Sequence, residues 1–146
     1  MAADLIAKAS STIDAPAEKV WNALVTPAAI TQYMFGTTVS SAWREGSPIS
    51  WKGEWQGKPY EDKGVILTFV PERTLRYSHF SPLAGLPDVP ENYHNVTIEL
   101  SGDGPRTRVA LAQDGNATEQ AREHSVKMWS SMLDGLKKFV ELSADG

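Results

Sequence analysis

Polar and apolar residues alternate over residues 5–13, which predicts a strand with one inward side formed by Leu5, Ala7, Ala9, Ser11 and Ile13. The period then becomes helical, with one apolar face formed by Ala17, Val20, Trp21 and Leu24. Proline opens this helix at Pro16 and a second helix at Thr26-Pro27, because its fixed φ is helical and its missing N–H would be unpaired there anyway. We expect the Thr26 hydroxyl to cap the second helix.

Strand patterns separated by turn signals fill the middle of the chain. They predict strands at 37–43, 49–55, 60–70, 75–80 and 95–100, and one more around Val109 and Leu111. The segment Ser101-Gly102-Asp103-Gly104-Pro105 predicts a hairpin turn. Seven strands joined mainly by short loops predict one antiparallel meander, with the first strand at an edge or closing the sheet.

A long amphipathic helix is predicted from 117 to about 141, with Asn116 as its cap and Glu119 completing a capping box. At ~1.5 Å per residue it would run ~37 Å, which is enough to cross a whole sheet. Gly135 costs ~1 kcal/mol inside a helix relative to alanine, and close packing would explain it. The apolar face of this helix comprises Ala121, Ser125, Met128, Trp129, Met132, Leu133, Leu136 and Val140.

The bulk composition narrows the class of protein. A chain of 146 residues, 41% hydrophobic and 22% charged, predicts one soluble domain spanning 1–146. Its net charge of -4 argues against nucleic acid or an anionic membrane as partner, since both require clustered Lys and Arg. The chain has no cysteine, which excludes disulfides and thiolate chemistry. No apolar run approaches ~18 residues and no signal peptide is visible, so we expect a cytoplasmic protein.

The chain resembles the START-like, birch-pollen-allergen-like (SRPBCC) superfamily and, within it, the homologues of the heat-shock chaperone ATPase activator. The resemblance covers nearly the whole chain. It rests on residues 15–24 (APAEKVWNAL), Thr26-Pro27, 64–71, 75–78, 95–100 and the last helix with Trp129 and Leu133. It implies an α+β helix-grip fold, in which a curved antiparallel sheet of about seven strands wraps around the long C-terminal helix and two short helices follow the first strand.

The resemblance also implies an apolar cavity between sheet and helix, and it brings no invariant catalytic motif. Eukaryotic chaperone activators carry a separate N-terminal domain for much of the chaperone contact. This chain starts almost at the first strand, so we do not expect full co-chaperone function.

Strand parity indicates which side chains would face such a cavity. His79 shares parity with Tyr77, and His94 shares parity with Val96. Methionine and tryptophan could line a promiscuous pocket or fill an ordinary core, and a buried histidine satisfied by its neighbours is the plain alternative to catalysis. The predicted ligand-binding residues are Met34, Trp51, Phe69, Tyr77, His79, His94, Met128, Trp129 and Met132.

The sequence does not support a metal site, a cofactor or a defined catalytic set. The three histidines form no His-x-His pair and no His-Glu-x-x-His motif. His124 is expected to be solvated beside the charged helix face. Glu54, Glu61 and Asp62 are expected to form a solvated acidic rim.

Three functions follow, in order of preference. The first is binding of a small apolar molecule, lipid-like or aromatic, in the cavity. The second is an enzyme similar to the polyketide cyclases and aromatases of the superfamily, with His79 or Tyr77 as the acid or base. The third is a chaperone-associated or homodimeric interaction module that uses the proline-rich loop 81–92, whose apolar residues are Leu83, Leu86 and Val89.

Overall fold

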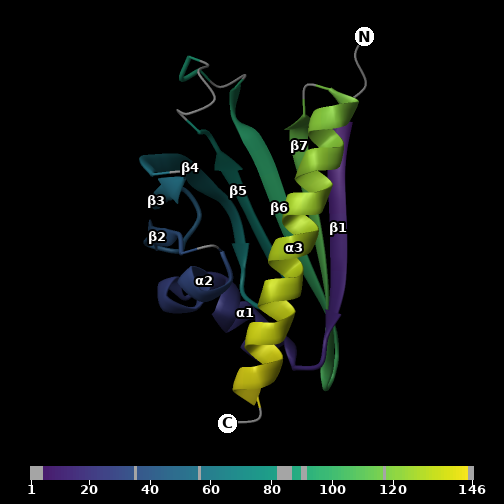
Figure 1. The fold of residues 1–146 in the computed structure, drawn as a ribbon. Coiled ribbons are helices and arrows are strands. Elements are labelled where there is room, and N and C mark those ends of the chain that lie inside the picture. Colours follow the sequence, from purple (N-terminus) through teal and green to yellow (C-terminus); the bar gives the residue numbers. More distant parts are fainter. Residues whose placement is uncertain are drawn as a thin grey trace.

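The computed structural model describes residues 5–34, 36–55, 57–81, 87–89, 92–116 and 118–144. The chain forms seven strands and three helices within these ranges, in the order predicted (Figure 1). They are β1 (Leu5–Ile13), α1 (Ala17–Val25), α2 (Pro27–Tyr33), β2 (Thr38–Ser41), β3 (Pro48–Trp55), β4 (Lys58–Val70), β5 (Thr74–His79), β6 (His94–Asp103), β7 (Arg106–Asn116) and α3 (Glu119–Ala144).

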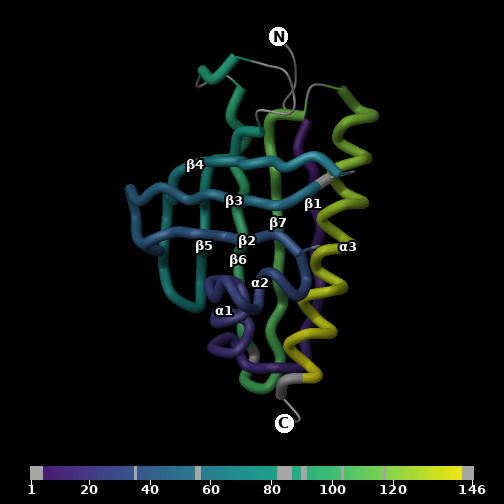
Figure 2. The backbone as a smooth tube through the Cα atoms, turned by 60° about the vertical axis from the view of Figure 1, so that its left-hand side comes forward, coloured from purple at the N-terminus to yellow at the C-terminus, as the bar shows by residue number. Residues whose placement is uncertain are grey.

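All strands belong to one antiparallel sheet, in the order β1-β7-β6-β5-β4-β3-β2. The predicted meander is therefore confirmed, and β1 lies at an edge beside β7. The sheet is strongly bent, and Figure 2 shows β2 and β3 running crosswise to β6 and β7. The 13-residue strand β4 spans the bend, and its pairing with β5 shifts register between Ile66 and Thr68. Such a bulge bends a strand and increases its twist.

The helix α3 lies along β1 and β7, while α1 and α2 cross the end of the sheet near the last turns of α3 (Figures 1 and 2). The later part of the predicted apolar face of α3 is buried, with Leu133, Leu136 and Val140 at most 2% exposed, whereas Met128 in the same face is 40% exposed. Gly135 allows α2 to approach, since a Cβ there would lie 3.3 Å from the Cβ and the carbonyl oxygen of Tyr33. This arrangement confirms the helix-grip fold.

Two predicted helix caps were wrong. Thr26 occupies the N-cap position of α2, but its hydroxyl makes no capping hydrogen bond. Thr118, and not Asn116, caps α3, because the Ala121 N–H donates to the Thr118 hydroxyl at 3.0 Å. Asn116 is used elsewhere: its amide donates to the Leu5 carbonyl at 2.8 Å and joins β7 to the start of β1. Both residues can accept from a backbone N–H, so the sequence alone did not distinguish them.

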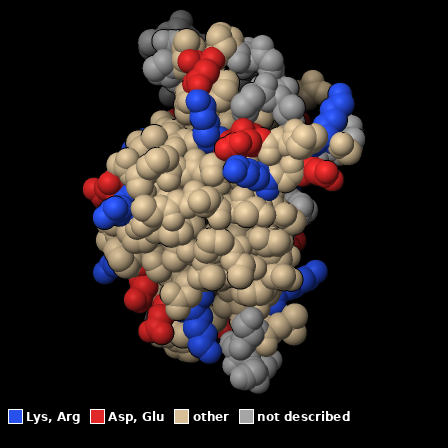
Figure 3. Space-filling model, turned by 90° about the vertical axis from the view of Figure 1, so that its left-hand side faces the viewer, with Lys and Arg blue, Asp and Glu red and all other residues tan. Residues whose placement is uncertain are grey.

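The outer face of the sheet carries apolar side chains at Val65, Leu67 and Val70, which are 39–44% exposed. On the side formed by β2–β4 and the short helices, charged side chains gather mainly at the periphery (Figure 3). In the part of the chain that the structure describes, no helix has the length and apolarity needed to cross a membrane.

Candidate functional site

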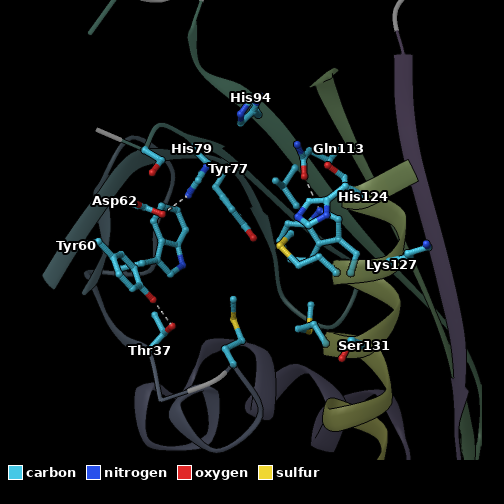
Figure 4. Close-up of a pocket in the computed structure, with 18 of the residues that line it drawn as sticks. Thr37, Tyr60, Asp62, Tyr77, His79, His94, Gln113, His124, Lys127 and Ser131 are labelled. Atoms are coloured by element: carbon cyan, nitrogen blue, oxygen red, sulfur yellow. Dashed lines mark hydrogen bonds and ion pairs between the residues drawn. The ribbon is translucent and has the colours of Figure 1, made fainter. Parts of the chain in front are cut away.

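A pocket of about 800 Å³ lies between the concave face of the bent sheet and α3. Strands β3 to β7 form one wall, α3 forms the opposite wall, and the segment after α2 contributes Met34 and Thr37. Figure 4 shows these side chains converging from the sheet and from α3. The pocket is open on the α3 side, where Met128 is 40% exposed and His124, Lys127 and Ser131 are exposed as well.

Aromatic rings and methionines form much of the pocket wall. The Trp51 ring on β3 packs against Tyr77 on β5, with 5.1 Å between the ring centroids. Trp129 and Met132 face them from α3 and are buried. These residues sit together because the bend carries β3 over the concave face of β5.

A carboxylate–imidazole pair lies among these rings. His79 Nε2 is 2.9 Å from Asp62 Oδ2, and the two side chains are 27% and 15% exposed. The His79 and Trp51 rings lie edge to face, with 5.0 Å between their centroids. The predicted acidic rim was therefore wrong for Asp62, which points into the pocket, whereas Glu61 is exposed and pairs with Lys52. Asp62 shares strand parity with buried Ile66, and this was the sequence signal for its inward orientation.

His94 extends the cluster. It is the cross-strand partner of His79, and the two rings stack with their centroids 6.0 Å apart. Burial lowers the pKa of His94, and the neighbouring His79 lowers it further, while Asp114 acts in the opposite direction. Burial disfavours the charged form of an imidazole, so His94 is neutral at pH 7. Its Nδ1 is buried against Gly115.

Sequence reasoning missed Gln113 on β7. The Trp129 indole N–H donates to Gln113 Oε1 at 2.5 Å (Figure 4), which ties α3 to the sheet inside the pocket. Gln113 shares parity with buried Val109 and Leu111, so alternation could have identified it as an inward polar residue. Tyr60 and Thr37, which hydrogen-bond through their hydroxyls at 2.8 Å, also line the pocket.

The pocket contains all of the predicted ligand-binding residues except Phe69. Phe69 faces the same side of the sheet but packs edge-on against Trp21 of α1, with ring centroids 5.2 Å apart. It lies seven residues along β4 from Asp62, up to ~23 Å at ~3.3 Å per residue. Strict alternation from Asp62 would put Phe69 on the opposite side of the sheet, and the register shift between Ile66 and Thr68 returns it to the concave side. Because Phe69 does not line the pocket, we leave it out of the proposed site.

Two further expectations concern the margin of the pocket. His124 is exposed, as expected, yet it lines the pocket mouth. Leu83 and Leu86 of the 81–92 loop lie outside the described residues, whereas Val89 is described. Among the described residues, no group of three or more His, Asp or Glu side chains is arranged to hold a metal ion.

The family of "Activator of Hsp90 ATPase homolog 1-like protein" matches residues 14–141 of this chain. The chain belongs to this family. The matched range starts just after β1 and ends in the last turns of α3, so it includes every strand and helix that lines the pocket.

Solved structures show the same fold. ChR145 from Cytophaga hutchinsonii is 56% identical, with both chains covered in full and a TM-score of 0.86. CV1439 from Chromobacterium violaceum is 23% identical over 93% of this chain and 96% of its own, with a TM-score of 0.75. The Aha1 dimer from Colwellia psychrerythraea is 21% identical over the same shares, with a TM-score of 0.71. No curated protein matches this chain.

Proposed function

We propose that this protein binds a small apolar molecule, aromatic or lipid-like, in the pocket between the sheet and α3. The observation that supports this proposal is the size of the pocket together with its walls. About 800 Å³ lies beside the aromatic pair Trp51 and Tyr77 and beside the methionines of α3. Binding sites for small molecules typically measure ~300–1,000 Å³ and combine apolar walls with a few polar groups.

Energetics also favour an occupied or hydrated pocket. At ~24 cal/mol per Å³ of apolar void, a dry cavity of this size would cost about 19 kcal/mol. Whole domains are stable by only ~5–15 kcal/mol. The pocket must therefore be filled, by water at its polar groups and open mouth or by a ligand that replaces this water.

A ligand screen by thermal unfolding tests the proposal. A ligand that binds only the native state at 100 times its Kd stabilises it by ~2.7 kcal/mol. For a chain of this length this raises the Tm by about 9 °C, at ~2.1 cal/mol/K of unfolding entropy per residue. Native mass spectrometry of protein purified from its own host would identify a ligand that copurifies. No shift across a broad library of lipids and aromatic compounds would overturn the proposal.

A matched pair of variants locates the binding. Met128→Trp places a bulky ring at the half-open mouth of the pocket, and we expect it to abolish the ligand-induced rise in Tm. Leu142→Trp makes the same kind of addition at a position on α3 that is 75% exposed and lies two turns of helix or more beyond the pocket. It should retain the full rise. Equal responses from both variants would place the ligand elsewhere.

The His79–Asp62 pair supports a second candidate function, acid–base catalysis on the bound molecule. In such a pair the carboxylate orients the imidazole, and the free ring nitrogen can accept a proton. NMR in D₂O tests this by following exchange of the hydrogens next to the carbonyl of an aryl methyl ketone. Catalysed exchange that His79→Gln removes would support an enzyme. Exchange at the buffer rate in a protein that binds the ketone would leave binding as the function.

The interaction-module hypothesis stays a prediction for this chain. One similar structure is a dimer, and sedimentation velocity of this protein would show whether it also associates. A single monomeric species at about 100 μM would contradict a homodimer with a Kd below this concentration, which corresponds to about -5.5 kcal/mol of association free energy.

A further inference from the structure

His94 occupies an end position in both the sheet and the pocket. It is the first residue of β6, and it pairs with His79, the last residue of β5. Figure 4 shows it at the end of the pocket away from Thr37 and Ser131. The end of a strand opens at a lower cost in free energy than the centre of a sheet. A movement of His94 can therefore stay local and leave the rest of the fold intact.

The neutral His94 ring fits its position closely. Its plane lies 17° from that of the His79 ring, with 6.0 Å between the ring centroids. On the side of β7 its Nδ1 atom is buried, and a Cβ built on Gly115 would lie only 2.6 Å from that atom. The ring thus uses space that is free because residue 115 is a glycine.

The same position does not suit a protonated ring. A neutral imidazole carries one N–H and can leave Nδ1 without a proton, whereas an imidazolium carries an N–H at both ring nitrogens. Within the described residues, Nδ1 of His94 has no hydrogen-bond partner. Protonation in place would bury a positive charge and an N–H without an acceptor, and both are costly.

Neighbouring charges act on the same ring. Burial lowers the pKa of His94, His79 on β5 lowers it further, and Asp114 on β7 raises it. His79 is itself bonded to Asp62 of β4. The other charged or histidine side chains that line this pocket are Glu54 of β3 and His124 and Lys127 of α3. The packed ring binds a proton less readily than a solvated imidazole does, so a pH below about 6.5 favours the unpacked ring.

We propose that His94 is a pH-sensitive switch in the pocket wall. The neutral ring packs against His79 and Gly115, and the protonated ring leaves this position for solvent and opens that end of the pocket. Because one proton is linked to the change, the ratio of open to closed protein rises by up to about tenfold per pH unit below about pH 6.5. This inference concerns access to the pocket and requires no particular ligand.

Proton NMR of the wild-type protein tests the switch. The pH is lowered from about 8 to about 5, across the ordinary histidine pKa of ~6.5. We expect the nuclear Overhauser effect between the His79 and His94 rings to disappear with the same midpoint as the titration of the His94 ring protons. The effect between Trp21 and Phe69, whose ring centroids lie 5.2 Å apart at the packed end of the sheet, should persist because the protein stays folded.

One pair of variants tests the packing of the ring. Gly115→Ala adds a methyl group where the His94 ring lies, so the effect between His79 and His94 should be absent even at neutral pH. Gly104→Ala makes the same substitution at another glycine with positive φ, where a Cβ meets nothing within 4 Å. It should retain the effect at neutral pH and lose it at the wild-type midpoint.

A second pair of variants tests the charge. Asp114→Asn keeps an oxygen for the Asn95 N–H, which Asp114 Oδ1 accepts at 2.6 Å, but it removes the negative charge that favours protonated His94. The midpoint should therefore move to lower pH. Asp134→Asn makes the same change at an exposed position on α3 and should leave the midpoint unchanged.

Several results would overturn the switch. They are an effect between His79 and His94 that survives protonation of His94, its loss only together with the effect between Trp21 and Phe69, its retention at neutral pH in Gly115→Ala, or an unmoved midpoint in Asp114→Asn. The wild-type titration decides by itself if a variant does not fold. None of these results bears on the proposed ligand binding, which the thermal unfolding screen tests separately.

Discussion

The hydroxyl of Tyr33 is expected to stabilise the junction between α1 and α2, which holds Met34 at the pocket. It donates to the Ala23 carbonyl at 2.8 Å in a buried hydrogen bond. Ala23 lies in the last turn of α1, and the residue four positions later is Pro27, which has no N–H to donate. The Tyr33 hydroxyl therefore supplies the partner that the helix cannot provide.

The substitution Tyr33→Phe removes this donor and changes little else. The ring stays available for its contact with Phe139, and the Tyr33 Cβ and backbone keep their place beside Gly135. The loss is therefore confined to the hydrogen bond and to a buried carbonyl without a partner. A lost hydrogen bond with an unsatisfied buried group costs ~1–3 kcal/mol, and we expect about 2 kcal/mol. For this chain length the Tm should fall by about 6–7 °C.

Thermal and urea unfolding followed by circular dichroism at pH 7.5 measure this loss. Tyr93→Phe is the matched control, because the Tyr93 hydroxyl donates to Asp88 at 2.7 Å in a solvent-exposed hydrogen bond. Exposed substitutions usually change stability by less than ~0.5 kcal/mol. If Tyr33→Phe were no more destabilising than Tyr93→Phe, the assignment of the Tyr33 hydroxyl as the partner of a terminal helix carbonyl would be refuted.

Three further predictions concern two buried polar side chains, His94 and Thr107, and the glycine packed against His94. The pKa of His94 is lowered in the folded protein, so as the pH falls the unfolded chain binds a proton at this histidine before the folded chain does. The contribution of neutral His94 to the free energy of unfolding is therefore complete above about pH 6.5 and declines below it. In urea unfolding at several pH values, the free energy of unfolding should decline less in His94→Gln than in the wild-type protein. Thr107→Val should lower the free energy of unfolding by about 1–3 kcal/mol, because the Thr107 hydroxyl donates to the Ala15 carbonyl at 2.8 Å in a buried position; a loss under about 0.5 kcal/mol would contradict the importance of this bond. Gly115→Ala should destabilise the protein more than Gly104→Ala. Both glycines have positive φ, but of the two only Gly115 would place a Cβ against another side chain, 2.6 Å from His94 Nδ1. Equal melting temperatures for the two variants would argue against that contact.

Much of the fold could be predicted because it depends on short-range patterns. Alternation over 5–13 predicted β1 with its observed bounds, and the turn at Gly104 predicted the β6–β7 hairpin, whose last pair is Asp103 with Arg106. The apolar stripe of the last helix also appeared as expected. Caps were less predictable, because several neighbouring residues such as Asn116 and Thr118 have the required chemistry and only the geometry of the turn selects one.

The candidate site was predictable only in part. Parity placed His79, His94 and Tyr77 on the concave face, and the structure places them in the pocket. The pairing of Asp62 with His79 depends on the register of β4 against β5, which pairs Lys63 with Phe80 and Ile66 with Tyr77 and so sets Asp62 diagonally across from His79. No local sequence pattern reveals that register. The position of Phe69 at the far end of the same face has the same origin.

The sequence by itself determined the order of the elements and the inward side of each, because side-chain direction in helices and strands follows the residue period. Tertiary structure decided which inward residues meet. The bulge near Ile66 and the curvature of the sheet separate a packed end at Trp21 and Phe69 from an open end at Asp62, His79 and Gln113. Those contacts join residues far apart in the chain, so their chemistry depends on the register and bending of the whole sheet.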